Sequence, residues 1–124
     1  MKPLCMLYVE DDADLRDIFQ EMLAGDQREV VACATAEDAL VLWNASHFDV
    51  LVTDNSLPGM SGTDLARRVL ATHPDRWVVI CSGYEYGDAI RTLGQHVRAL
   101  PKPFELEELE RLLIEIVVAQ EGTR

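Results

Sequence analysis

Acidic, hydroxyl and amine side chains follow the ends of several short apolar runs in this sequence. Glu10 and Asp11 follow the first run, and Asp54, Ser82 and Lys102 each follow a later one. Carboxylates gathered without imidazole or thiolate suit a hard cation that prefers oxygen ligands, which means Mg²⁺ or Mn²⁺. With a lysine and a hydroxyl added, such a group could support phosphoryl transfer to an aspartate, because the transferred group carries charge that must be neutralised.

The elements that must position these side chains alternate in type along the chain. Runs of strand character cover Leu4–Val9, Val30–Ala34, Asp49–Thr53, Trp77–Cys81 and Val97–Leu100. Helical periodicity predicts five helices. The first covers Ala13–Ala24, the second starts at the cap Thr35, and the third starts at the cap Thr63 and ends before Pro74. The fourth covers Asp88–Leu93, and the fifth carries a long apolar stripe from Leu106 to Val117. Strict alternation of this kind is typical of βαβ units, so we expect an α/β fold with a five-stranded parallel sheet.

The carboxyl ends of parallel strands lie along one edge of a sheet, and ligands bind there where the strand order reverses. If the order is 2-1-3-4-5, the first and third strands are neighbours. Glu10, Asp11 and Asp54 would then share one pocket, although more than 40 residues separate them. Three carboxylates so close together repel one another unless a cation neutralises them. The sequence therefore predicts a Mg²⁺ or Mn²⁺ site at this edge.

Length and composition narrow the class of protein. The 124 residues carry a formal charge of −11 and three cysteines without a Cys-x-x-Cys pair. We expect one domain over residues 1–121, followed by a polar tail over residues 122–124. The acidic balance argues against direct nucleic-acid binding. The unpaired cysteines, together with apolar runs far shorter than the roughly 18 residues of a membrane span, favour a cytoplasmic protein that does not enter the membrane.

Four sequence strings point to a known family when they are taken together. They are LYVEDD (Leu7–Asp12), LVTDNSLPGMSG (Leu51–Gly62), VVICSGY (Val78–Tyr84) and PKPF (Pro101–Phe104). In this order and spacing, the chain closely resembles the receiver domain of two-component response regulators. The resemblance covers essentially the whole chain, and it implies a flavodoxin-like, doubly wound (βα)5 sandwich with strand order 2-1-3-4-5.

The resemblance also implies an acceptor and a metal site. By position, Asp54 is the aspartate that receives a phosphoryl group. Glu10, Asp11 and Asp54 match the carboxylates that bind Mg²⁺, and the backbone carbonyl of Ser56 matches the remaining protein ligand. Asp12, which follows the acidic pair, is expected instead at the start of the first helix, where the helix dipole favours a negative charge.

Two further positions match the switch and the lysine of the family. Ser82 corresponds to the hydroxyl that turns toward the phosphoryl group. Lys102 corresponds to the family lysine, whose bond to the following proline is usually cis. The implied donor is a histidine kinase or a histidine phosphotransfer protein, and the output passes to a downstream protein or a fused effector domain. Such a module is not a turnover enzyme; it catalyses only its own phosphorylation and dephosphorylation.

One position departs from the family pattern. Three residues before the lysine most receivers carry Tyr or Phe, and this chain carries Ala99. A large rotating side chain cannot signal from there, so we expect the segment 83–87, with Tyr84 and Tyr86, and the following helix to move instead.

Two alternative functions compete with a phosphorylated receiver. A phosphatase of the haloacid-dehalogenase type would carry Asp-x-Asp, but Asn55 and Ser56 follow Asp54. A degenerate receiver that serves only as a binding domain would have lost the aspartate, the acidic pair or the lysine, and all of them are present. The glycine-rich fingerprints of nucleotide-binding folds do not occur.

Overall fold

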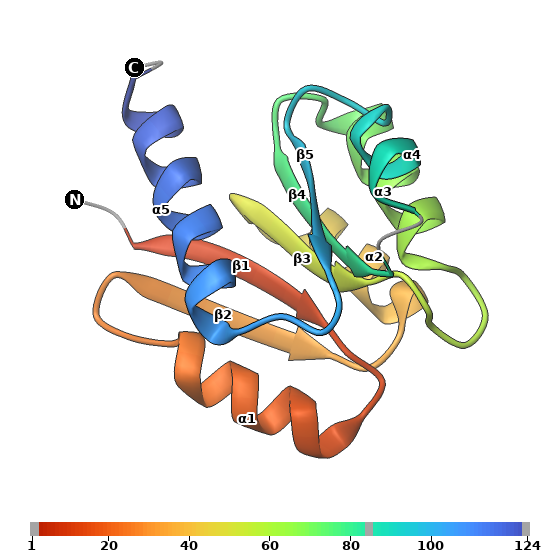
Figure 1. The fold of residues 1–124 in the computed structure, drawn as a ribbon, viewed down its shortest axis with the longest axis horizontal. Helices are drawn as coiled ribbons and strands as arrows, with labels where there is room; N and C mark the ends of the chain where they lie inside the picture. The colour runs from red at the N-terminus through yellow and green to blue at the C-terminus, as the bar shows by residue number, and fades with distance from the viewer. Residues whose placement is uncertain (1–2, 84–85, 123–124) are drawn as a thin grey trace.

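A computed structural model describes residues 3–83 and 86–122, and its centre is a five-stranded parallel sheet (Figure 1). The strands are β1 (Leu4–Val9), β2 (Arg28–Cys33), β3 (Val50–Asp54), β4 (Trp77–Ser82) and β5 (Val97–Pro101). Their order across the sheet is β2-β1-β3-β4-β5, and every neighbouring pair is parallel. The predicted α/β class, the parallel sheet and the 2-1-3-4-5 order are confirmed.

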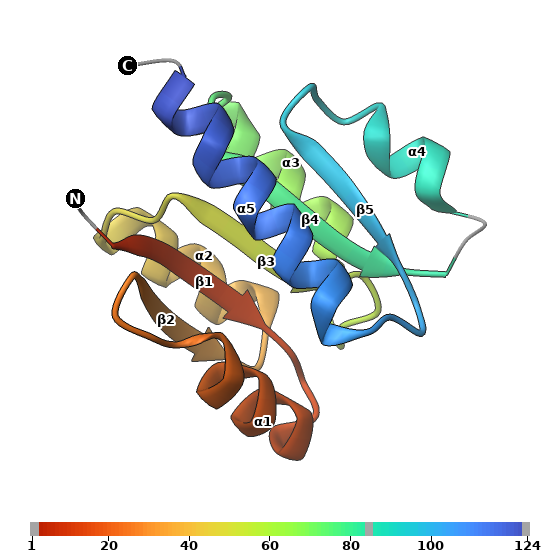
Figure 2. The ribbon, with the colours of Figure 1, turned by 60° about the vertical axis from the view of Figure 1, so that its left-hand side comes forward.

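In the described residues, four helices connect successive strands and a fifth follows β5, and together they cover both faces of the sheet. They are α1 (Ala13–Leu23), α2 (Ala36–Ala45), α3 (Gly62–Thr72), α4 (Gly87–Arg91) and α5 (Leu106–Gly122). Figure 2 shows α1 and α5 on the near side of the sheet, with α2 and α3 behind it. The core is divided accordingly: Leu23, Leu109 and Leu113 pack on one face, and Trp43, Leu65 and Ile90 pack on the other.

Helix caps form directly beside the edge where the polar side chains gather. The carboxylate of Asp12 accepts hydrogen bonds from the backbone N–H groups of Asp14 (3.0 Å) and Leu15 (3.1 Å), which confirms the expected helix start. Thr35 caps α2 by accepting from the N–H of Asp38 at 3.1 Å. Each cap ends the preceding loop at a fixed residue, because its side chain satisfies donors that the first helical turn leaves unpaired.

Several predicted boundaries are wrong by one or more residues. β2 begins at Arg28 and ends at Cys33, because its pairing with β1 already starts at Leu4 opposite Arg28. The third helix is capped by Ser61, which accepts from the N–H of Asp64 at 3.1 Å. Thr63, the predicted cap, instead donates its own N–H and hydroxyl to a neighbouring side chain.

The last two helices also differ from the predicted limits. α4 spans Gly87–Arg91, one residue earlier at its start than expected and two residues shorter at its end. α5 continues to Gly122, five residues beyond Val117, where the apolar stripe predicted from the sequence ends. None of the helices within the described residues is long and apolar enough to cross a membrane.

Candidate phosphoacceptor site

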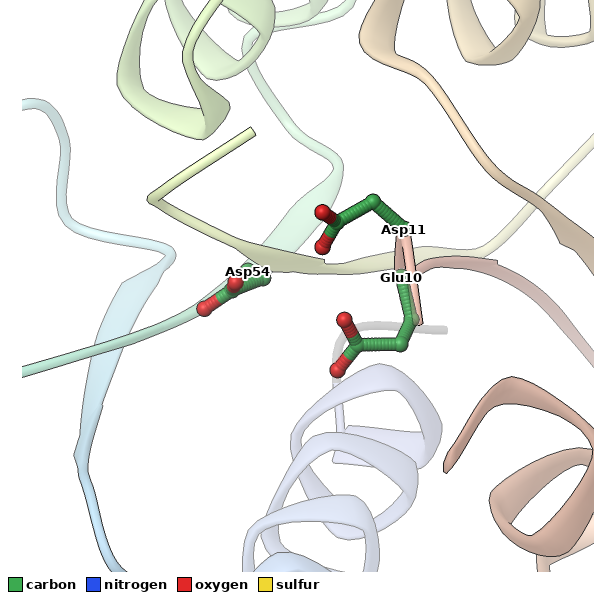
Figure 3. Close-up of side chains that lie close together, drawn as sticks. All are labelled: Glu10, Asp11 and Asp54. Carbon is green, nitrogen blue, oxygen red and sulfur yellow. The ribbon is translucent and has the colours of Figure 1, made fainter. Parts of the chain in front are cut away.

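Three carboxylates meet at the carboxyl edge of the sheet, as the strand order requires. Figure 3 shows Glu10 and Asp11, from the loop after β1, facing Asp54 at the end of β3. One oxygen from each of the three lies within 4.8 Å of the other two. Glu10 and Asp54 are buried, and Asp11 is exposed. The structure thus brings together the three side chains predicted to bind a cation.

Lys102 supplies the positive charge of the cluster. Its Nζ lies 2.5 Å from Oδ1 of Asp54. Burial lowers the pKa of Lys102, but the hydrogen bond to Asp54 and the nearby carboxylates outweigh burial, so its pKa lies above the ordinary value. The peptide bond between Lys102 and Pro103 is cis, as the sequence resemblance implies. The lysine is therefore fully charged at neutral pH and contacts the predicted acceptor.

The electrostatic balance at Glu10 favours a cation. Burial raises the pKa of Glu10; a hydrogen bond from the N–H of Asp12 opposes this, while Asp11 and Asp54 raise the pKa further. The net pKa of Glu10 lies above its ordinary value, because burial and the two acidic neighbours outweigh the hydrogen bond from Asp12 and the charge of Lys102. The donor set consists of oxygen atoms alone, with an open side at exposed Asp11, and this fits a hard divalent ion that retains water ligands.

Arg16 fixes the loop that carries the acidic pair. Its Nη1 donates to the backbone carbonyl of Glu10 at 2.8 Å, and the N–H of Glu10 donates to the carbonyl of Cys33 at 3.1 Å. The carboxylate of Glu10 in turn accepts from the N–H of Asp12 at 3.3 Å. Sequence analysis missed Arg16. The available signal was a basic residue in the second turn of a helix that starts directly after an acidic loop.

The loop after β3 is held on both sides of Ser56. The side-chain oxygen of Asn55 accepts from Thr63, at 3.0 Å from its N–H and 2.6 Å from its hydroxyl. Gly59 has φ of 76°, a conformation that side chains rarely adopt. A side chain at Gly62 would collide with the carbonyl oxygen of Asp54, so glycine is required there. Ser56 is exposed in this loop, and its carbonyl as a metal ligand stays a prediction.

The predicted switch hydroxyl lies on the neighbouring strand. Ser82 is buried at the end of β4, and its Oγ donates to the carbonyl of Gly83 at 3.3 Å. The N–H of Lys102 donates to the carbonyl of Ser82 at 2.8 Å, which ties the ends of β4 and β5 together. Tyr84, named above as a moving aromatic, lies outside the described residues, and Tyr86 is exposed.

The known proteins that resemble this chain include response regulators. The two-component response regulator PhoP of Pseudomonas aeruginosa is 37% identical over 111 residues, which cover 87% of this chain and 49% of that protein. The chain spans only 6% to 49% of the lengths of the curated relatives it matches.

Solved structures show the same fold. A putative response regulator from Chloroflexus aurantiacus is 28% identical with a TM-score of 0.83, covering 94% of this chain and 99% of that one. The response regulator TrrA from Thermotoga maritima, solved in complex with Mg²⁺-BeF, has a TM-score of 0.81 at 22% identity, over 94% of this chain and 99% of that one. The family model of the response regulator receiver domain matches residues 6–114. The chain therefore belongs to the response regulator receiver domain family.

Proposed function

We propose that Asp54 accepts a phosphoryl group from a histidine kinase or a histidine phosphotransfer protein, and that phosphorylation changes which partner the chain binds. One observation carries this proposal. The carboxylate of Asp54 lies at the edge of the sheet with Lys102 Nζ at 2.5 Å and two further carboxylates within 4.8 Å. A nucleophile, a fixed cation and a site for a divalent ion therefore converge on one oxygen pair.

The residues suited to hold Mg²⁺, or Mn²⁺ in its place, are Glu10, Asp11, Asp54 and the backbone carbonyl of Ser56. When bound, the ion neutralises charge on the carboxylates and on the oxygens of the transferred group. The pKa of Glu10, raised by burial and by its acidic neighbours, supports this assignment. The loop anchors at Arg16 and Asn55 keep the donors in place before any ligand arrives.

The chemical step uses three side chains of this chain. An oxygen of Asp54 attacks phosphorus, the bond from phosphorus to the donor's imidazole nitrogen breaks, and that nitrogen keeps the electron pair. The ammonium of Lys102 then pairs with a phosphoryl oxygen in place of the carboxylate it contacts now. Ser82 turns its hydroxyl from the carbonyl of Gly83 toward the same group. Hydrolysis of the acyl phosphate returns the chain to its starting state.

The biological role is a signalling switch, and receiver domains have no separate catalytic activity. Its output would reach either a downstream protein or an effector domain fused to the same chain. The acidic surface, with a formal charge of −11, disfavours direct contact with nucleic acid. The donor is expected to contact the exposed side of the carboxylate group, at Asp11.

The proposal is tested by phosphorylation with defined donors. Acetyl phosphate and phosphoramidate, each with Mg²⁺, should add one phosphoryl group to the chain, measured by intact mass. A histidine kinase labelled with radioactive ATP tests protein-to-protein transfer. Asp54→Asn should abolish the adduct, whereas Asp17→Asn, which removes an exposed carboxylate on α1 with the same change in charge, should keep it. An undiminished adduct in Asp54→Asn would refute the assignment.

A further inference from the structure

The loop that carries Ser56 is held at its base and at its tip by different elements. It joins β3 to α3. At its base, the carbonyl of Asn55 accepts a hydrogen bond from the N–H of Gly62 at 3.1 Å. At its tip, the N–H of Met60 donates to Oε2 of Glu37 at 3.3 Å, although Glu37 lies 23 residues earlier, in the first turn of α2. Ser56 therefore lies in a segment that is closed at one end and tied to a neighbouring helix at the other.

The backbone of the loop leaves room for the carboxylate of Glu37. Gly59, which precedes Met60, has φ of 76°. A Cβ atom at Gly59 would lie 2.6 Å from Oε2 of Glu37, closer than nonbonded atoms approach one another. Glycine therefore allows both the left-handed backbone and the close approach of the carboxylate. Two separate features of the loop, a donated N–H and a missing Cβ, match the position of this one side chain.

The contact from Glu37 restricts the backbone beside an exposed residue. Leu57 and Met60 are partly buried and pack against the core on the side of α2 and α3, whereas Ser56 is exposed. Fixing a free backbone segment costs conformational entropy. A carbonyl that is already restricted loses less of this entropy when it binds an ion, and its affinity for the ion is correspondingly higher. A tie at the tip of the loop should therefore favour metal binding at Ser56.

Glu37 does not belong to the metal site itself. Within the described residues, the carboxylates close enough together to share an ion are Glu10, Asp11 and Asp54. We propose that Glu37 is a positioning residue for this site: by accepting the hydrogen bond from the loop tip, it holds the segment that carries the Ser56 carbonyl and raises the affinity for Mg²⁺ without touching the ion. This inference rests on the proposed function, because it assumes that the Ser56 carbonyl binds the metal.

Three variants of one helical turn separate the hydrogen bond from the charge. Glu37→Ala removes the acceptor, Glu37→Gln removes the charge but keeps an acceptor oxygen, and Asp38→Ala removes the neighbouring exposed carboxylate. The dissociation constant for Mg²⁺, measured by isothermal titration calorimetry, should rise about fivefold in Glu37→Ala, which corresponds to the roughly 1 kcal/mol of one hydrogen bond. It should stay within about twofold of the parent value in the other two variants, because salt screens exposed charges. An unchanged affinity in Glu37→Ala, or an equal loss in Glu37→Gln or Asp38→Ala, would overturn the inference.

NMR provides a second measurement on the loop itself. Without Mg²⁺, the amide hydrogen of Met60 should exchange faster in Glu37→Ala than in the parent and in Glu37→Gln. Saturating Mg²⁺ should shift the carbonyl ¹³C signal of Ser56 in the parent. Unchanged exchange at Met60, or an unshifted Ser56 signal, would overturn the inference. If Asp54 is phosphorylated in a parent chain whose Mg²⁺ affinity does not depend on Glu37, the positioning role fails and the phosphoacceptor stands; if the parent neither binds Mg²⁺ nor accepts a phosphoryl group, the proposed function itself fails.

Discussion

Replacing Glu10 with glutamine should make the chain more stable when no divalent ion is present. The substitution removes one of three carboxylates whose oxygens lie within 4.8 Å of one another. At that separation two like charges repel by about 1 kcal/mol in water and about 3.5 kcal/mol at an effective dielectric constant of 20. Lys102 offsets part of this repulsion. We therefore expect Glu10→Gln to raise the free energy of unfolding by about 1–2 kcal/mol in EDTA.

With Mg²⁺ present, the parent chain should become more stable than Glu10→Gln, the reverse of the order in EDTA. A ligand that binds only the folded state stabilises it, by about 2.7 kcal/mol at a hundred times its dissociation constant. The parent should gain this stability as Mg²⁺ is added, and Glu10→Gln should gain far less because it lacks one ligand. Glutamine keeps an oxygen to accept from the N–H of Asp12, so the loop bond is retained. Urea unfolding followed by circular dichroism, in EDTA and in saturating Mg²⁺, measures both effects.

The pH dependence has a defined sign. The pKa of Glu10 in the folded chain lies above its ordinary 4.5, first because of burial and then because of its acidic neighbours. Ionising Glu10 therefore destabilises the folded chain. This destabilisation is absent below about pH 4.5 and complete above the pKa of Glu10 in the folded chain, so the parent loses stability as the pH rises between these two values. The advantage of Glu10→Gln in EDTA should disappear at the acid end.

Glu21→Gln is the matched control for this prediction, because it makes the same change of charge at an exposed position of α1. It should leave both the stability in EDTA and the gain with Mg²⁺ close to those of the parent. If Glu10→Gln is less stable than the parent in EDTA, or gains as much from Mg²⁺, the electrostatic account of the site is incorrect.

Three further outcomes can be measured. Lys102→Ala should keep the far-ultraviolet circular dichroism of the parent but lose phosphorylation-dependent partner binding. Normal partner binding by this variant would reject the proposal that Lys102 pairs with the phosphoryl group. Arg28 and Glu110 form a two-point ion pair with side chains 21% and 32% exposed, so a double-mutant cycle of Arg28→Met and Glu110→Gln should give about 1 kcal/mol. Because the hydrogen bond from Arg28 lowers the pKa of Glu110, this coupling should be present at neutral pH and disappear as the pH falls through that lowered pKa. Beryllofluoride with Mg²⁺ should change amide hydrogen exchange at residues 86–93 and leave β5 nearly unchanged; changes confined to β5 and α5 would contradict this.

The strands of the sheet and the helices between them could be predicted from the sequence, because continuous apolar runs and helical apolar stripes mark the side chains that are buried. Asp54 and Lys102 are separated by 48 residues, and β4 lies between their strands, but both lie at the carboxyl edge of the sheet, where the long side chain of Lys102 contacts Asp54. Caps were less predictable: Ser61 and Thr63 are both good capping residues. The choice depended on Asn55, whose side chain engages Thr63 across the loop.

Contacts made by long side chains could not be predicted from the pattern. Glu110 belongs to an acidic helix start that looks solvated in sequence, but it pairs with Arg28, 82 residues away. Arg16 donates to the backbone carbonyl of Glu10. Every residue has a backbone carbonyl, so the sequence does not indicate which one accepts this hydrogen bond.

Because position 99 is alanine and carries no aromatic ring, we expect backbone hydrogen bonds to connect Ser82 with α4. One such connection passes through the carbonyl of Gly83. The carbonyl of Gly83 accepts two hydrogen bonds, from the Ser82 hydroxyl at 3.3 Å and from the N–H of Tyr86 at 3.2 Å. Tyr86 immediately precedes α4, a helix of five residues that, within the described part of the chain, has no side-chain cap at its start. If the Ser82 hydroxyl turns toward a phosphoryl group, this shared carbonyl loses one of its two donors. Because a short helix without a side-chain cap opens at low cost in free energy, we expect α4 to shift on phosphorylation while β5 keeps its pairing with β4.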